Sequence, residues 1–314
     1  MIDEMLINQL PAPTWNRLRM NDTKLADIEL PQDICEPRVS LQGSVCLNKN
    51  KNTGCCGCSE HALCSEHGSN FAKMPTGMGE AMGKLGEGQT LRLIADAGKS
   101  IASVTLRYED GKNCFNRLEI EAKAGSELTV FMTYISTAQA AGQASVQTKI
   151  AAAAGASVKL VQVQLLGQSY VQLNDVGCEL GDNAAFELLQ LQLGSKRIYN
   201  GVRTELVGEA ADFNAAIGYY GRQEQTIDMN FIANHYGKKT TCEMTADGVL
   251  HVEPRRYYTV YGDGKDFYLG RHRLLDAVTS DGIPLAAVTL VAANVFRSYE
   301  RETQLAWLLG SVFF

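Results

Sequence analysis

The feature of this chain that most constrains its fold is a repeat of roughly 28 residues in which apolar and polar residues alternate. The repeat is visible in GSELTVFMTYI, ASVKLVQVQLL, AAFELLQLQLG, ADFNAAIGYYG and KTTCEMTADGV. Aligning Leu128, Val158, Phe186, Phe213 and Thr241 gives steps of 30, 28, 27 and 28 residues. Alternation with a period of two is typical of half-buried β-strands, and a near-constant step of this length indicates a repeat architecture.

Two folds can account for this pattern. The alternation excludes helical repeats, and a β-propeller needs a longer period with more strands in each blade. A parallel β-solenoid fits, with short strands in each coil, Gly and Asn at the corners, and each coil burying its inner face against the next. An antiparallel sandwich with regular hairpins fits as well. The pattern alone leaves both open.

Composition narrows the class of protein. A chain of 314 residues with 45% hydrophobic residues can bury a large core. The 29 basic and 35 acidic residues give a net charge of -6 without a basic run, so we expect no nucleic-acid partner. The N-terminus lacks the continuous apolar stretch of a signal peptide, and residues 283–296 are shorter than the ~20 residues that cross a bilayer. The sequence predicts a cytoplasmic protein without a membrane partner.

The pattern divides the chain into three parts. Residues 1–90 form an N-terminal arm followed by a Cys- and Gly-rich segment, and over 31–90 we expect loop or a loosely packed cap. Residues 91–250 carry the repeat and form the predicted core. Residues 251–314 are atypical, with a composition that shifts toward Tyr, Arg and Val.

Four stretches together carry a resemblance to a known family: INQLPAPTWNRLRMN near the start, MPTGMGEAMG from Met74, SVQTKIAAAAGASVKLVQVQLLGQSYVQLNDVG with Asp175 near its end, and GRQEQTIDMNFIANHYGKKTTCEMTADGVL with Asp228 and His235. The combination resembles the SufB/SufD family of iron–sulfur cluster assembly proteins and is most similar to its SufD-type members. The resemblance implies a mainly β fold, a right-handed parallel β-helix with an irregular or partly helical N-terminal segment. It therefore favours the solenoid over the sandwich.

The resemblance also implies a function. SufD-like proteins are scaffold subunits rather than enzymes, and they act with a SufB-like protein and a SufC-like ABC ATPase. A transient iron–sulfur cluster is built at the interface with a partner, and a homodimer is a further arrangement. The chain has no G-x-x-x-x-G-K-[ST] loop, so the ATP chemistry would come from a partner.

The resemblance stops after Leu250. Neither the HGA string that carries the interfacial histidine of the family nor the C-terminal helices that bind SufC are recognisable in 251–314. We expect this segment to derive from a frameshift, a truncation or a fused sequence. A truncated, non-functional relative is therefore one alternative function.

Asp228 and His235 are the polar pair that the family motif supplies. A neutral histidine can bind iron or relay protons while a carboxylate orients its other nitrogen. The alternative is structural, with both side chains hydrogen-bonded to the backbone of neighbouring coils at a corner. For Cys114, Cys178 and Cys242 we expect packing, because a buried free cysteine behaves as a small apolar residue.

The densest group of potential metal ligands is Cys55, Cys58, His61 and Cys64. Thiolate and imidazole groups at this spacing can bind zinc or iron. An exposed loop with incidental thiols is the competing interpretation, since glycines and the run NKNKN surround the cluster. A metal-binding or metal-delivery protein that uses residues 46–67 is therefore the second alternative function.

Overall fold

The computed structural model describes residues 4–9, 22–25, 27–48, 71–86, 89–222, 225–251, 271–278 and 284–287. The elements are β1 (Met5–Ile7), β2 (Thr23–Leu25), β3 (Arg38–Asn48), the 3-10 helix η2 (Gly79–Leu85), β4 (Gln89–Arg107), β5 (Lys112–Ala122), β6 (Ser126–Ile135), β7 (Ala141–Ala152), β8 (Ser157–Leu165), β9 (Ser169–Leu180), β10 (Ala185–Gln192), β11 (Arg197–Leu206), β12 (Asp212–Arg222), β13 (Thr226–His235), β14 (Thr241–His251), β15 (Arg271–Val278) and β16 (Pro284–Ala287).

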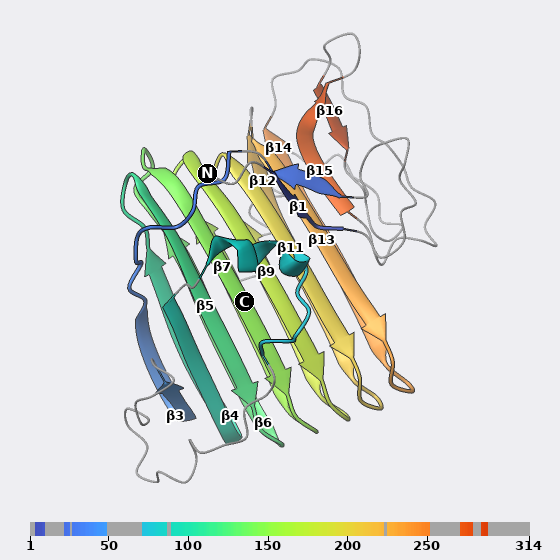
Figure 1. Cartoon of the computed structure of the whole chain (residues 1–314). Coiled ribbons are helices and arrows are strands. Elements are labelled where there is room, and N and C mark those ends of the chain that lie inside the picture. The colour runs from blue at the N-terminus through green and yellow to red at the C-terminus, as the bar shows by residue number, and fades with distance from the viewer. Residues whose placement is uncertain are drawn as a thin grey trace.

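The strands from β4 to β14 wind into a parallel β-solenoid of about six turns (Figure 1). The strands β4, β6, β8, β10, β12 and β14 stack in one sheet, called the even sheet here, and β5, β7, β9, β11 and β13 stack in the other, the odd sheet. β4 belongs to both, because Gln89–Ala95 pair with β5 and Gly98–Arg107 pair with β6. All pairs from β4 to β14 are parallel, which excludes the sandwich and confirms the predicted β-helix.

The register follows the repeat read from the sequence, with one exception. Leu128 pairs with Val158, Val158 with Phe186, and Phe186 with Phe213. In the last coil Phe213 pairs with Cys242, so the alignment on Thr241 was wrong by one residue. Because neighbouring residues of a strand point to opposite faces, Cys242 packs against the core whereas Thr241 is exposed.

The coil corners that follow β5, β7, β9, β11 and β13 share one backbone conformation. Gly125, Gly155, Asn183, Ala210 and Lys239 have φ values of 70°, 66°, 54°, 56° and 57°. Their spacing matches the strand register, so the left-handed residue recurs at the same point of each coil. The first three are the Gly and Asn expected at corners, while Ala210 and Lys239 adopt the conformation at a steric cost.

The core lies between the two sheets and is built from inward-facing apolar residues of successive coils. Leu128, Val158 and Leu160 are at most 1% exposed, and the rings of Phe186 and Phe213 stack with centroids 5.3 Å apart. Each coil therefore completes the core of its neighbour, as expected for a solenoid.

Antiparallel strands flank the coils at both ends. β3 runs antiparallel to β4 along nearly its whole length, with a bulge between Gly43 and Val45. The expectation of loop or loose cap over 31–90 was therefore wrong for β3, whose alternation was hidden by the glycines and cysteines around it.

At the other end of the solenoid β15 pairs antiparallel with β13, and β16 pairs antiparallel with β15. No helix within the described ranges is long and apolar enough to cross a membrane.

Candidate functional site

Residues from each of the four stretches that carried the resemblance meet on the outer face of the odd sheet, although the stretches lie far apart in sequence. η2 lies over this face, in front of β7, β9 and β11, and β1, which pairs with β2, lies near β11 and β13 (Figure 1). They form a second apolar cluster, separate from the solenoid core, with members Met5, Ile7, Leu25, Ile28, Met78, Ala81, Met82, Leu85, Phe115, Leu173 and Tyr199. Burial of these apolar side chains thus favours docking of the N-terminal segments on the odd sheet.

Asp175 is the first polar anchor of this contact. It lies on β9 at a position that faces away from the core, yet it is 0% exposed. Its Oδ1 accepts the backbone N–H of Met78 at 2.9 Å, and its Oδ2 accepts Gln147 Nε2 at 2.9 Å. Burial raises the pKa of Asp175 to about 6, because the hydrogen bonds from Gln147 and Met78 offset only part of the loss of hydration.

Glycines let the segment Pro75–Met78 approach the sheet. A Cβ on Gly177 would lie 2.4 Å from Pro75 O, and one on Gly201 would lie 2.7 Å from Gly77 C. A Cβ on Gly77 would in turn lie 2.1 Å from Gly201 C. The backbone N–H of Gly77 donates to Val176 O at 3.1 Å. Only residues without a side chain permit this contact between backbones.

Asp228 is the second anchor, on β13, and it is also 0% exposed. Asn8 Nδ2 donates to Asp228 Oδ1 at 3.1 Å, and the Thr23 hydroxyl donates to Asp228 Oδ2. The same Asn8 amide reaches Asn200 O at 3.4 Å. Asp228 therefore contacts the N-terminal arm, whereas the structural interpretation of the sequence had placed its partners in the backbone of neighbouring coils.

The structure does not bring His235 to Asp228. Both lie on β13, but seven residues of strand separate them by about 23 Å. His235 is exposed at the end of the strand, and its Nδ1 is 2.7 Å from Thr240 Oγ1. A carboxylate-oriented histidine, the functional arrangement considered for this pair, is not formed between these two residues.

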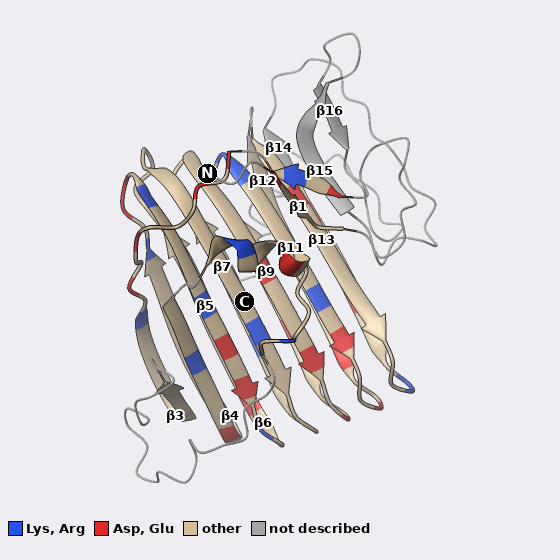
Figure 2. Ribbon diagram, viewed as in Figure 1, with Lys and Arg blue, Asp and Glu red and all other residues tan. Residues whose placement is uncertain are grey.

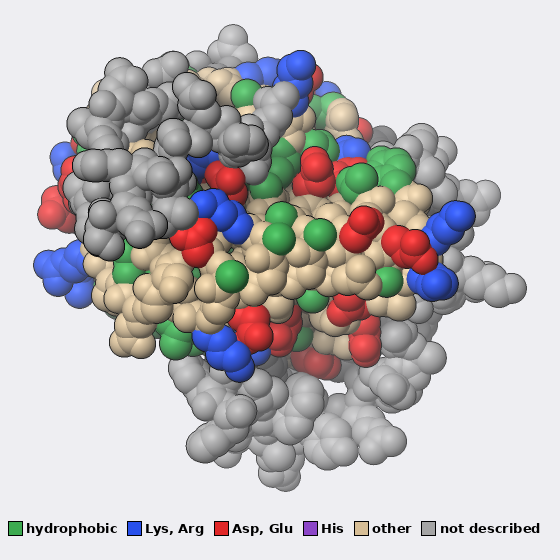
Figure 3. Space-filling model, turned by 90° about the horizontal axis from the view of Figure 1, so that it is seen from below, with side chains coloured by type: hydrophobic (Ala, Val, Ile, Leu, Met, Phe, Trp, Pro, Cys, Tyr) green, Lys and Arg blue, Asp and Glu red, His purple; other side chains and the backbone are tan. Residues whose placement is uncertain are grey.

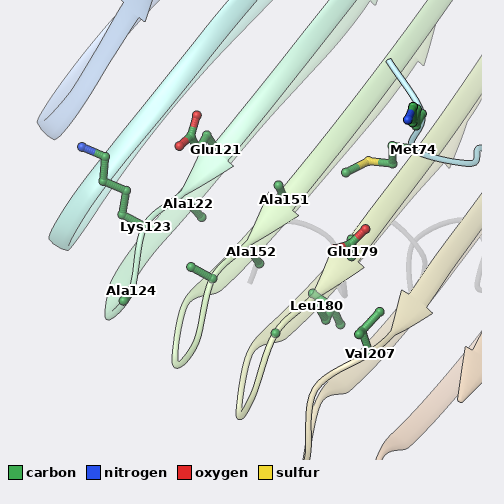
Figure 4. Close-up of a pocket in the computed structure, with 13 residues that line it drawn as sticks. Met74, Glu121, Ala122, Lys123, Ala124, Ala151, Ala152, Glu179, Leu180 and Val207 are labelled. Atoms are coloured by element: carbon green, nitrogen blue, oxygen red, sulfur yellow. The ribbon is translucent and has the colours of Figure 1, made fainter. Parts of the chain in front are cut away.

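Below the docked segments the same face carries a shallow groove of about 590 Å³ (Figure 4). Five of its thirteen lining residues are alanines, and its charged lining residues are Lys73, Glu121, Lys123 and Glu179. Acidic residues gather toward the lower ends of the odd strands (Figure 2), and charges of both signs surround the coil turns (Figure 3). Glu121 pairs with Arg92 at 3.0 Å, and Lys123 pairs with Asp96 at 2.9 Å.

Lys149, on β7, binds the start of the segment that continues to Lys73 and Met74 of the groove lining. Its Nζ donates to Phe71 O at 2.5 Å, and burial lowers the pKa of its ammonium group. Across the part of the chain that is described, no three His, Cys, Asp or Glu side chains are placed to hold a metal ion together. The groove thus offers a mixed-charge surface with small side chains rather than a coordination site.

Sequence reasoning missed a polar network inside the solenoid. Gln162 Nε2 donates to the Tyr134 hydroxyl at 2.8 Å, and Gln190 Nε2 donates to Gln162 Oε1 at 2.7 Å. From the opposite sheet Asn174 Nδ2 donates to Asn200 Oδ1 at 2.8 Å, and Asn200 Nδ2 donates to Gln190 Oε1 at 2.6 Å. The signal was present in the inward glutamines of LVQVQL and LLQLQL, which recur one coil apart.

Apart from Cys46, which is half-buried on β3, the cysteines divide into three groups. Cys178 is buried on β9 and Cys242 is half-buried on β14, both in contact with the core. Cys114 is buried on β5, with Cys35 beside it. Cys55, Cys58, His61 and Cys64 lie outside the described residues, so their metal site stays a prediction.

Comparison with known proteins agrees with the architecture. A family described as "SUF system FeS cluster assembly, SufBD core domain" matches residues 105–260, which span the coils from the last three residues of β4 through β14. The match extends ten residues beyond Leu250, where the resemblance was expected to stop. No curated protein and no solved structure matched the chain. The match and the parallel β-solenoid place the chain in the SufB/SufD family, whose domain takes part in iron–sulfur cluster assembly.

Proposed function

We propose that this protein is a cytoplasmic, SufD-like scaffold subunit of an iron–sulfur cluster assembly complex, without catalysis of its own. It acts with a SufB-like protein and a SufC-like ABC ATPase, and the nascent cluster is cargo built at the interface with a partner. The family match over the coils supports a role in cluster assembly.

One observation carries the scaffold role. Residues from all four stretches that resemble the family form buried contacts between chain segments: Asp175 accepts the backbone N–H of Met78, and Asp228 accepts the side-chain amide of Asn8. Both carboxylates are 0% exposed and are consumed by these structural hydrogen bonds. Buried hydrogen bonds of this kind make the coils and the docked segments rigid. A subunit that positions its partners needs such rigidity.

Co-purification tests the proposal. The tagged full chain is co-expressed with the SufB-like and SufC-like proteins of the same genome, and the eluate is analysed by native mass spectrometry. We expect a complex that contains both partners, together with iron and sulfide after supply of ferrous iron and a sulfur donor. Recovery of the chain alone or as a homodimer, with both partners soluble in the same lysate, would contradict the proposal.

A matched variant separates the scaffold from the metal-delivery alternative. In Cys55→Ser/Cys58→Ser, a scaffold keeps its partners and its capacity to support cluster formation. A metal-delivery protein instead loses stoichiometric zinc or iron, measured by elemental analysis of the free chain, and with it the delivery of metal. Retention of the complex with unchanged cluster content supports the scaffold; loss of cluster content with the complex intact supports the alternative.

A further inference from the structure

Two buried thiols lie side by side at the first coil. Cys35 precedes β3 and is 4% exposed, and Cys114 lies on β5 and is 2% exposed. Each thiol shifts the pKa of the other, which places the two side chains next to each other. The Cys35 thiol also lies 3.3 Å from Arg107 O, to which it can donate. The two residues are 79 positions apart, so the contact joins the N-terminal segment to the solenoid.

The backbone around the pair is held in register. Asp33 forms a parallel bridge with Cys114, and the Asp33 backbone N–H donates to Asn113 O at 3.1 Å. On the other side, Asn116 Nδ2 donates to Cys35 O at 2.8 Å. The segment that carries Cys35 is therefore fixed beside β5 on both sides of the thiol, which keeps the two sulfurs together.

The surroundings distinguish the two sulfurs. The neighbouring Cys35 thiol lowers the pKa of Cys114, and the charge of Lys112 adds to this effect, while burial opposes it. The neighbouring Cys114 thiol and burial raise the pKa of Cys35. Cys114 is therefore the first of the two to form a thiolate, and the thiolate is the form that reacts with oxidants.

We propose that Cys35 and Cys114 are a dithiol site that peroxide converts to an intramolecular disulfide. The Cys114 thiolate attacks one peroxide oxygen, the O–O bond breaks, and a sulfenic acid and one water form. The Cys35 sulfur then attacks the sulfenic sulfur, the S–O bond breaks, and the second water leaves with the Cys35 proton. Two thiols lose two electrons, and one hydrogen peroxide is reduced to two waters.

The disulfide would tie the N-terminal segment covalently to β5. It would close a loop that contains β3 and the first strand of the even sheet, and so stabilise the end of the solenoid where β3 covers β4. This modification uses neither of the two aspartate anchors.

Peptide mapping tests the site on the wild-type full chain. The folded protein is treated with hydrogen peroxide, free thiols are alkylated, and the tryptic digest is analysed by mass spectrometry. Trypsin releases Cys35 in the peptide 25–38 and Cys114 in the peptide 113–117, and neither contains another cysteine. We expect the two peptides to be linked after oxidation and separate after reduction, with a melting temperature several degrees higher for the oxidised protein.

Two variants complete the test. In Cys35→Ala the linked peptides and the shift in melting temperature should both disappear, whereas in the control Cys178→Ala, which removes a buried thiol elsewhere in the core, both should persist. The proposal is overturned if the linked peptides form only in denaturant, or if the folded protein yields sulfinic or sulfonic acid at Cys114 without a link.

Discussion

The outer faces of the two sheets share the same strand alternation but are stabilised differently. On the odd sheet Asp175 and Asp228 are fully buried and bind residues 97 and 220 positions away. On the even sheet Phe131 and Leu165 are 42% and 45% exposed, and Lys159 and Glu187 form an ion pair of 3.0 Å between adjacent coils, each of the two side chains at least 39% exposed. The outer face of the odd sheet therefore contacts segments that are distant in sequence, whereas the outer face of the even sheet is stabilised by contacts between successive coils.

The two faces differ in how far they depend on particular residues at particular coils. Contacts along the repeat connect each coil to the next and are interchangeable between coils. The odd face needs particular residues at particular coils, because the polar anchors and the glycines must meet one docked segment. Asp175 and Asp228 thus hold the N-terminal segments on the odd sheet.

The largest expected effect comes from adding a side chain at Gly201, where the backbone of the docked segment contacts the odd sheet. Gly201→Ala places a Cβ 2.7 Å from the backbone of Gly77 and Met78, so we expect a loss of about 3 kcal/mol in the free energy of unfolding. Gly83→Ala in η2 is the control, because no atom lies within 4 Å of its Cβ position. Urea unfolding measures both. Equal stabilities for the two variants would mean that the segment 75–78 does not rest on Gly201.

Removing an anchor comes next. Asp175→Ala leaves the Met78 N–H and the Gln147 amide without their acceptor, and we expect a loss of about 2 kcal/mol. The matched variant on the even sheet is Asp212→Ala, whose carboxylate is half-exposed and accepts from Asn214 at 2.6 Å. It should cost less than about 1 kcal/mol. If chemical denaturation shows the reverse order, the two faces do not differ as described.

The pH dependence sharpens the same contrast. Burial raises the pKa of Asp175 to about 6, above its value of about 3.9 in an unfolded chain, so the folded state binds this proton more tightly. Its contribution to stability is complete below pH ~4 and is lost as pH rises through about 6. Between pH ~4.5 and ~7, the wild type should lose roughly 1–2 kcal/mol relative to Asp175→Asn. Parallel pH profiles for the two proteins would contradict this assignment.

The smallest effect is expected on the even face. Lys159→Ala removes the ion pair with Glu187, and because both side chains are well exposed the change should be below ~0.5 kcal/mol. Added salt should reduce even this difference. A loss comparable to that of Asp175→Ala, measured in the same urea titration, would show that the even face depends on particular contacts as well.

The fold was largely predictable because the residues that pair between successive coils of a solenoid recur at a regular spacing in the sequence. Leu128, Val158, Phe186 and Phe213 could be aligned without a structure since each coil buries the same inward position. The alignment failed at Thr241 because the lead-in KTTCEM offers two neighbouring residues, and only packing shows that Cys242 faces inward.

The site was predictable only in part. Asp175 and Asp228 stood out through the resemblance, but their partners could not be found from local pattern. Met78 and Asn8 are brought to them by the docking of segments far away in the chain, and no periodicity in either segment signals that contact. The family motif suggested the pairing of Asp228 with His235, but the two residues lie at opposite parts of an extended strand and are therefore far apart.

Hydrogen exchange at residues 77 and 78 measures directly whether Asp175 holds the docked segment on the odd sheet. The N–H groups of Gly77 and Met78 donate to Val176 O and to Asp175, so in the wild type they should exchange slowly. In Asp175→Ala we expect them to exchange at least about tenfold faster, while amides of β10 and β12 on the even sheet keep their rates. Unchanged rates at Gly77 and Met78, or rates in the wild type equal to those of an unstructured peptide, would contradict the claim.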